Sequence, residues 1–156
     1  MILIKIVFKL DQIVTFVIQI LHMRTILIIG AGRSASSLIQ YLLNKSFDEN
    51  LHLTIADLSI ELAQKKTNNH PNATPLQFDI FNSEQRKAEI NKADIVISML
   101  PAHLHIEVAK DCIAYKKHMV TASYISQEML QLDEQAKDAN LIFMNEIGLD
   151  PGIDHM

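Results

Sequence analysis

A short run of small residues begins at Gly30 and has the G-x-G-x-x-A spacing of a phosphate-binding loop. Gly30 permits a tight turn out of a strand, and Gly32, which has no Cβ, lets a diphosphate approach the backbone. The start of a following helix would offer free N–H groups and a partial positive charge. We therefore expect a dinucleotide's diphosphate to be bound at Gly30, Gly32, Arg33, Ser34 and Ala35.

An acidic residue, Asp57, follows this motif by about 20 residues. At that spacing a carboxylate can accept hydrogen bonds from ribose hydroxyls and repel a 2′-phosphate, which favours NAD over NADP. Arg33 keeps NADP open, because its guanidinium could reach a phosphate. Asp57 could also be a solvated loop residue or the cap of the next helix.

Two histidines follow the segment Ser98–Pro101, beside which the nicotinamide half of a dinucleotide would lie. His103 and His105 are two residues apart on an expected helix, so their side chains point in different directions. No cysteine or third clustered histidine accompanies them, so we expect no metal site. His105 either faces a substrate or is a surface or capping residue of its helix.

The segment Thr121–Tyr124 carries three hydroxyl groups at the end of another expected strand. Hydroxyls there suit hydrogen bonding to a carboxamide or to a substrate carboxylate. The segment could instead be a polar loop before a helix capped by Ser126. No G-x-S-x-G elbow is present, and no residue is assigned as a catalytic acid, base or nucleophile.

The elements that must position these residues alternate between short apolar runs and helical patterns. The runs predict strands at Thr25–Ile29, Leu51–Asp57, Ala73–Asp79, Asp94–Leu100, Lys117–Ser123 and Leu141–Glu146. Helices are expected from Ser34 onward and over Ser59–Lys66, Ser83–Asn91, His103–Tyr115 and Ser126–Asp138. Such alternation predicts an α/β fold with a doubly wound parallel sheet, a three-layer α-β-α Rossmann arrangement of strand order 3-2-1-4-5-6.

Composition narrows the class of protein. The chain has 156 residues, of which 49% are apolar and 21% charged, as in an ordinary globular domain. A net charge of −4 without a basic stripe argues against nucleic acid as a partner. The single cysteine, Cys112, excludes an internal disulfide and fits a reducing, cytoplasmic location. Its apolar neighbours predict a buried helix position.

Residues 1–22 form an apolar extension before the predicted domain, which spans residues 23–149. The uncharged stretch Gln12–Leu21 is too short to cross a bilayer, which needs about 20 apolar residues. We favour Met23 as the natural start, so that the extension reflects a mis-assigned start; a membrane-surface anchor is the alternative, and a membrane partner is not expected.

From Met23 onward the chain resembles the nucleotide-binding domain of glutamate-forming saccharopine dehydrogenase. The resemblance rests on "IIGAGRSA", "DIVISMLP" with His105, "KHMVTASYIS" and "MNEIGLDPGIDHM". It implies an NAD(P)-dependent oxidoreductase of lysine metabolism. The secondary amine of saccharopine gives hydride to the cofactor, and water splits the resulting imine into glutamate and aminoadipate semialdehyde.

The resemblance also implies roles for individual residues. Leu100 would line the nicotinamide side, and Asp57 would contact the adenine ribose. Ser123 and Tyr124 would contact both cofactor and saccharopine, with Asp150 near the nicotinamide. His105 matches a histidine that the family often has, and we include it among the substrate-binding residues.

Family members continue into a substrate and dimerisation domain, and the full-length protein is expected to be a homodimer. Residues 150–156 would be a stub of that connection, so we interpret the chain as an incomplete family member that is inactive alone. Three alternatives stay open: a non-enzymatic dinucleotide-sensing module, an inactive fragment, and an enzyme similar to carboxynorspermidine synthase.

Overall fold

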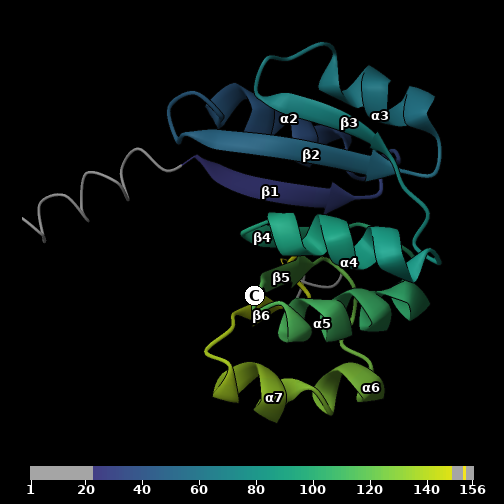
Figure 1. Ribbon diagram of the computed structural model, residues 1–156, viewed down its shortest axis with the longest axis vertical. Helices are drawn as coiled ribbons and strands as arrows, with labels where there is room; N and C mark the ends of the chain where they lie inside the picture. The colour runs from purple at the N-terminus through teal and green to yellow at the C-terminus, as the bar shows by residue number, and fades with distance from the viewer. Residues whose placement is uncertain (1–22, 149–152, 154–156) are drawn as a thin grey trace, which may run out of the picture.

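The computed structural model describes residues 23–148 and residue 153. Six parallel strands form one sheet, in the order β3-β2-β1-β4-β5-β6 (Figure 1). Their bounds are Arg24–Ile29 (β1), Leu51–Asp57 (β2), Ala73–Gln77 (β3), Ile95–Ser98 (β4), His118–Thr121 (β5) and Phe143–Met144 (β6). The predicted strand order and the doubly wound fold class are confirmed.

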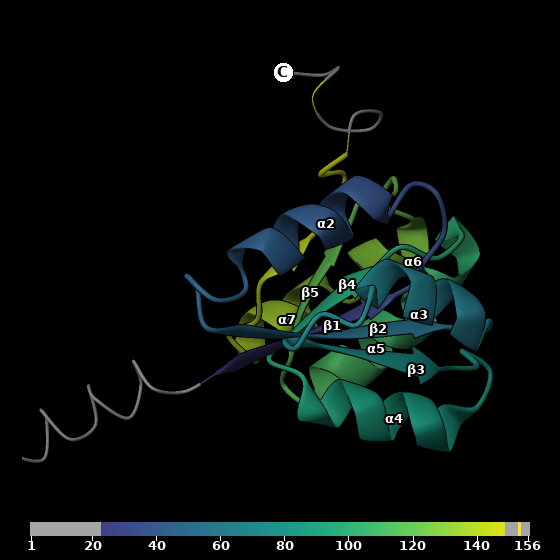
Figure 2. The same cartoon turned by 90° about the horizontal axis from the view of Figure 1, so that it is seen from above.

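Helices connect successive strands and cover both faces of the sheet. They span Ser36–Lys45 (α2), Ile60–Thr67 (α3), Ser83–Lys92 (α4), His105–Ala114 (α5), Gln127–Leu130 (α6) and Asp133–Asp138 (α7), with a 3₁₀ turn at Ala102–Leu104 (η1). In Figure 2, α2 and α4 lie on opposite sides of the sheet. The arrangement has the three layers that the alternating sequence pattern predicts.

The central strand β1 supplies side chains to both halves of the core. Leu27 and Ile29 pack with residues of α4 and α5, whereas Ile26 and Ile28 pack with residues of α2 and α3. Alternation along a strand sends neighbouring side chains to opposite faces, so a run apolar at every position is buried on both sides. Each such side chain stabilises the fold by about 1.5–3 kcal/mol on burial.

Several element ends differ from the sequence prediction. α2 begins at Ser36 rather than Ser34, because the Ser36 N–H first bonds the Arg33 carbonyl in a turn (3.2 Å). The strands β3, β4, β5 and β6 are shorter than predicted: β3 ends two residues early, and β4, β5 and β6 lose residues at both ends. The helix expected from His103 opens as the 3₁₀ turn η1.

One predicted helix is wrong. The helix expected over Ser126–Asp138 is two helices, α6 and α7. Ser126 does cap the first, since its hydroxyl accepts the Met129 N–H at 3.2 Å. At Leu132 the helical ladder tightens to a bond with the Met129 carbonyl, three residues back (3.1 Å), and the regular helix is interrupted there.

One further sequence expectation, the burial of Cys112, falls within the described residues. Cys112 is fully buried in α5, as predicted, and burial raises the pKa of its thiol to about 12. Over residues 23–148, no helix is long and apolar enough to span a membrane. The apolar extension 1–22 and the stub 150–156 lie outside the continuously described residues, so the expectations about them stay predictions.

Candidate functional site

The glycine loop after β1 takes a conformation that explains both of its glycines. Gly30 has φ +105°, and a Cβ there would lie 2.8 Å from the Met99 carbonyl oxygen just after β4. A side chain would therefore strain the backbone and clash with a neighbouring chain segment. A Cβ on Gly32 would meet nothing within 4 Å, so that position opens onto free space. Gly30 serves the turn, and Gly32 leaves room for a ligand group near the backbone.

Asp57 lies at the end of β2 and holds this loop in place. Its Oδ2 accepts the Ala31 N–H at 2.7 Å, and its Oδ1 accepts the Ser59 N–H at 3.0 Å. The Gly30 N–H bonds the Ala56 carbonyl at 2.7 Å. An ionised carboxylate has about four lone-pair sites, so these two bonds leave capacity for ribose hydroxyls. The sequence prediction did not include this contact with the loop.

A cavity of about 260 Å³, called here the adenine-side cavity, opens beside Asp57 at the carboxyl ends of β1, β2 and β3. Its lining is mainly apolar and includes Gly30, Asp57, Leu58, Phe81, Leu100 and Leu104. A second hollow of about 310 Å³, the hydroxyl-side hollow, is lined by Ser34, Ser98, Leu100, Ala102, Ser123 and Tyr124. Leu100 borders both, so the two spaces adjoin at the strand 1–strand 4 junction, where the sequence analysis expected the ligand.

His105 organises the floor of the hydroxyl-side hollow. Its Nδ1 lies 2.8 Å from the Ser98 hydroxyl, and its Nε2 lies 2.7 Å from the Ser123 hydroxyl and 3.2 Å from the Thr121 hydroxyl. The imidazole is only 3% exposed. It is therefore not a surface residue, and the hollow is lined by its partner Ser123 and not by the imidazole itself.

The surroundings of His105 favour the neutral form of its ring. Burial lowers the pKa of His105 below its ordinary value, and the nearby His103 lowers it further. A neutral imidazole has one N–H donor and one acceptor, which suits a ring between hydroxyl groups. Ser98 and Thr121 were not predicted as its partners. The predicted strand order placed the ends of these two strands side by side, but only the structure shows that Ser98 and Thr121 pair in register beside His105.

The other predicted site residues occupy varied positions. Ala35 is fully buried and packs in the core beneath the loop, as its place in the motif predicts. Arg33 and Ser34 are exposed at the loop, and Ser34 also lines the hydroxyl-side hollow. Tyr124 is 59% exposed at the rim of that hollow. Asp150 lies outside the described residues. Residues 23–148 contain no cluster of side chains suited to hold a metal ion.

Comparison with known proteins places this geometry in a family. The sequence model described as the saccharopine dehydrogenase NADP binding domain matches residues 26–144, which is most of the described chain. The chain belongs to the saccharopine dehydrogenase family. The match covers the sheet from β1 to β6, including the glycine loop, the adenine-side cavity and His105.

Relatives from fungi and mammals agree with this assignment. The chain is 39% identical over 133 residues to saccharopine dehydrogenase [NADP(+), L-glutamate-forming] of Pyricularia oryzae, covering 85% of this chain and 29% of that protein. It is 36% identical to the mitochondrial alpha-aminoadipic semialdehyde synthase of Mus musculus, covering 89% of this chain and 15% of that protein. The chain therefore spans under a third of the length of these relatives.

A solved structure shows the same fold. The apo saccharopine dehydrogenase (L-Glu forming) of Saccharomyces cerevisiae superposes with a TM-score of 0.76 at 31% identity, covering 85% of this chain and 29% of that one. These relatives favour a saccharopine dehydrogenase domain over a separate sensing module or a carboxynorspermidine synthase-like enzyme. The domain is an NAD(P)-binding domain of an oxidoreductase family, as the resemblance implied.

Proposed function

We propose that this chain supplies the cofactor-binding domain of an enzyme that acts on the CH–NH group of saccharopine. The reaction interconverts saccharopine with glutamate and aminoadipate semialdehyde. The observation that carries the proposal is the glycine loop, bent at Gly30 and open at Gly32, between an apolar cavity on one side and a hydroxyl-lined hollow on the other. The names of the fungal and mammalian relatives supply the substrate class.

The residues of this chain would bind and orient a dinucleotide across the two spaces. The open backbone at Gly32 and the start of α2 suit a diphosphate, and the adenine-side cavity suits an apolar base. The hydroxyls of Ser123 and Tyr124 would orient a carboxamide or a substrate carboxylate, with His105 as a positioning residue behind Ser123. When bound, the nicotinamide supplies hydride transfer; no acid or base is assigned to this chain.

For the cofactor we propose a preference for NAD over NADP. The Asp57 carboxylate lines the adenine-side cavity and can accept further hydrogen bonds beside the two that it makes to the backbone. The next residue, Leu58, carries no positive charge that could bind a 2′-phosphate. A carboxylate there accepts ribose hydroxyls and repels a 2′-phosphate. The fungal relatives are named for NADP(+), and Arg33 is exposed nearby, so NADP is the rival that an experiment must test.

A binding titration tests the cofactor proposals. We expect NADH fluorescence to show saturable binding to this chain, with NADPH bound about tenfold more weakly. NADPH bound as tightly as NADH would contradict the preference. Binding of neither nucleotide would contradict the proposal that the domain holds a dinucleotide.

The substrate proposal needs the rest of a family member. A chimaera would carry residues 23–148 in place of the matching segment of the Pyricularia oryzae relative. We expect this chimaera to reduce the cofactor when saccharopine is added, with the unaltered relative as the positive control. A chimaera that binds NADH but shows no saccharopine-dependent reduction would contradict the assigned substrate.

A further inference from the structure

The turn between β3 and α4, residues 79–82, forms one wall of the adenine-side cavity. Asp79, Ile80 and Phe81 all line that cavity. Phe81 is 77% exposed, and Leu58, which lines the same cavity from the end of β2, is 69% exposed. These two large, exposed apolar side chains beside one cavity offer non-polar surface to a planar base, and the Phe81 ring offers a flat one.

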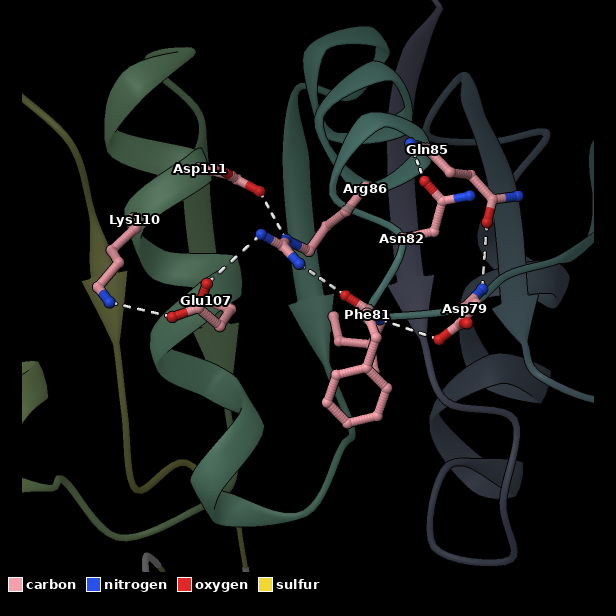
Figure 3. Close-up of polar contacts among 9 residues, drawn as sticks. Asp79, Phe81, Asn82, Gln85, Arg86, Glu107, Lys110 and Asp111 are labelled. Carbon is pink, nitrogen blue, oxygen red and sulfur yellow. Dashed lines mark hydrogen bonds and ion pairs between the residues drawn. The ribbon is translucent and has the colours of Figure 1, made fainter.

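The first turn of α4 holds this wall through its own side chains (Figure 3). The Asn82 carbonyl oxygen Oδ1 caps the helix by accepting the Gln85 N–H at 3.1 Å. Gln85 accepts the Asp79 N–H at 3.1 Å and donates to the Gln77 carbonyl at 2.8 Å. Within the turn, the Phe81 N–H bonds Asp79 Oδ1 at 2.9 Å. The backbone that carries Phe81 is therefore anchored to β3 and to α4.

Arg86, which follows Gln85 in α4, also anchors this turn. It is only 6% exposed. Its guanidinium donates from Nη1 to the Ile80 carbonyl at 2.6 Å and from Nε to Asp111 Oδ2 of α5 at 2.6 Å. Nη2 lies 3.5 Å from Glu107 Oε2. In Figure 3 the Arg86 guanidinium contacts Asp111 and Glu107 on one side and the turn before α4 on the other. The Phe81 ring points away from the guanidinium.

We propose that Arg86 is a positioning residue for the adenine half of the bound dinucleotide. By fixing the Ile80 carbonyl against α5, it sets the place of Phe81, whose ring lines the cavity and packs on the base. This inference rests on the proposed dinucleotide-binding function and adds to it a residue that does not itself touch the ligand. The guanidinium connects the packing of α4 on α5 to the shape of the cavity.

The geometry requires arginine rather than any cation. A planar guanidinium has five donors in a rigid fork and can serve a carbonyl and a carboxylate at once, whereas lysine presents one ammonium on a flexible stem. An Arg86→Lys variant would keep a charge beside Asp111. It would give up the simultaneous contact with the Ile80 carbonyl, and the turn would lose its anchor.

The double variant Arg86→Met/Asp111→Leu and the single variant Asp111→Asn separate the effect of Arg86 on stability from its effect on the cavity. Arg86→Met alone would leave the Asp111 charge buried and unpaired, which is strongly destabilising. The double variant Arg86→Met/Asp111→Leu removes both charges, and such replacements are often neutral in stability. It still lacks the bond to Ile80. Conversely, Asp111→Asn keeps an oxygen acceptor for Arg86 and leaves the Ile80 bond in place.

The experiment measures binding of NADH, AMP and nicotinamide mononucleotide to the chain, together with urea denaturation. Saturable NADH binding by the unaltered chain first establishes the proposed function. We then expect Arg86→Lys, Arg86→Met/Asp111→Leu and Phe81→Ala to weaken AMP and NADH about fivefold or more, with nicotinamide mononucleotide unchanged. Asp111→Asn should lower the denaturation midpoint and leave AMP affinity within about twofold.

Other outcomes would overturn the inference while leaving the proposed function intact. One is a folded double variant that binds AMP as tightly as the unaltered chain. Another is an equal loss of affinity for AMP and nicotinamide mononucleotide, which would show a general loss of structure. If the double variant does not fold, Arg86→Lys decides, and normal AMP binding by this variant would refute the role of Arg86. Normal AMP binding by Phe81→Ala would refute the packing of that ring on the base.

Discussion

The Nε2 atom of His105 lies 2.7 Å from the hydroxyl oxygen of Ser123, one of the residues that line the hydroxyl-side hollow. The same ring contacts Ser98 through Nδ1, so one imidazole joins the start of α5 to residues at the ends of β4 and β5. Because a neutral ring donates from one nitrogen and accepts at the other, its tautomer decides whether Ser123 offers a ligand a donor or an acceptor. A ligand that needs one of these would select that tautomer.

Protonation of His105 should destabilise the fold at acid pH. Burial lowers the pKa of this ring in the folded state below its ordinary value of 6.5. The unfolded chain then binds more protons than the folded chain, so the free energy of unfolding falls as pH decreases below 6.5 towards the folded-state pKa. Urea denaturation between about pH 5 and about pH 8 would measure this slope.

The matched variant for this test is His105→Gln, which keeps a hydrogen-bonding side chain but does not titrate. The variant should be less stable than the unaltered chain near neutral pH, by about 1 kcal/mol for an imperfectly replaced hydrogen bond. The dependence of its stability on acid pH should be shallower, because residue 105 no longer titrates. Some slope should remain, because the other histidines are still present. Identical slopes in the two proteins would show that His105 does not contribute to the pH dependence.

Substitution by alanine should affect stability at Gly30 and cofactor binding at Gly32. Gly30→Ala should lower the free energy of unfolding by about 1–3 kcal/mol, because of the positive φ and the contact with the Met99 carbonyl. Gly32→Ala should leave stability unchanged, because its Cβ meets nothing, but should weaken NADH binding by occupying the space for the diphosphate. Urea denaturation and NADH titration measure the two effects; a destabilised Gly32→Ala chain with normal binding would contradict this division.

Removing the charge of Asp57 should change cofactor choice more than folding. In Asp57→Asn the amide oxygen can still accept the Ala31 N–H, so the loop keeps this anchor, whereas the amide nitrogen cannot accept the Ser59 N–H. We expect NADH to bind more weakly by about 1–3 kcal/mol, since charged hydrogen bonds to ribose are lost, and the preference over NADPH to shrink. Parallel titrations with both nucleotides measure the ratio, and an unchanged ratio would refute the role of the carboxylate.

Cys112 should be unreactive while the protein is folded. Its thiol is fully buried in α5, with a pKa raised to about 12, first by burial and then by the neighbouring Asp111. Since the thiolate is the reactive form, iodoacetamide at about pH 8 should modify the chain only after denaturant is added. Mass spectrometry would count the modification, and rapid labelling of the native chain would contradict the buried position.

The sequence by itself determined the architecture of this domain. The all-apolar run of β1 predicts a strand covered on both faces, and the residues Ile26 to Ile29 are buried against helices on both sides. The glycine spacing after it predicted a turn, and the strand and helix alternation predicted the strand order. These features are legible because they depend on local periodicity and on conformations that glycine alone adopts readily.

Only the tertiary structure decided which polar side chains meet. The contact of Asp57 with Ala31, the hydroxyls around His105, and the reach of Arg86 from α4 to Ile80 and Asp111 each join residues from different elements. Their meeting depends on strand register, on where each helix begins and on helix packing, none of which is encoded in a short window of sequence. The interruption between α6 and α7 at Leu132 likewise could not be read from the helical spacing of residues 126–138, because it depends on where each helix begins and ends.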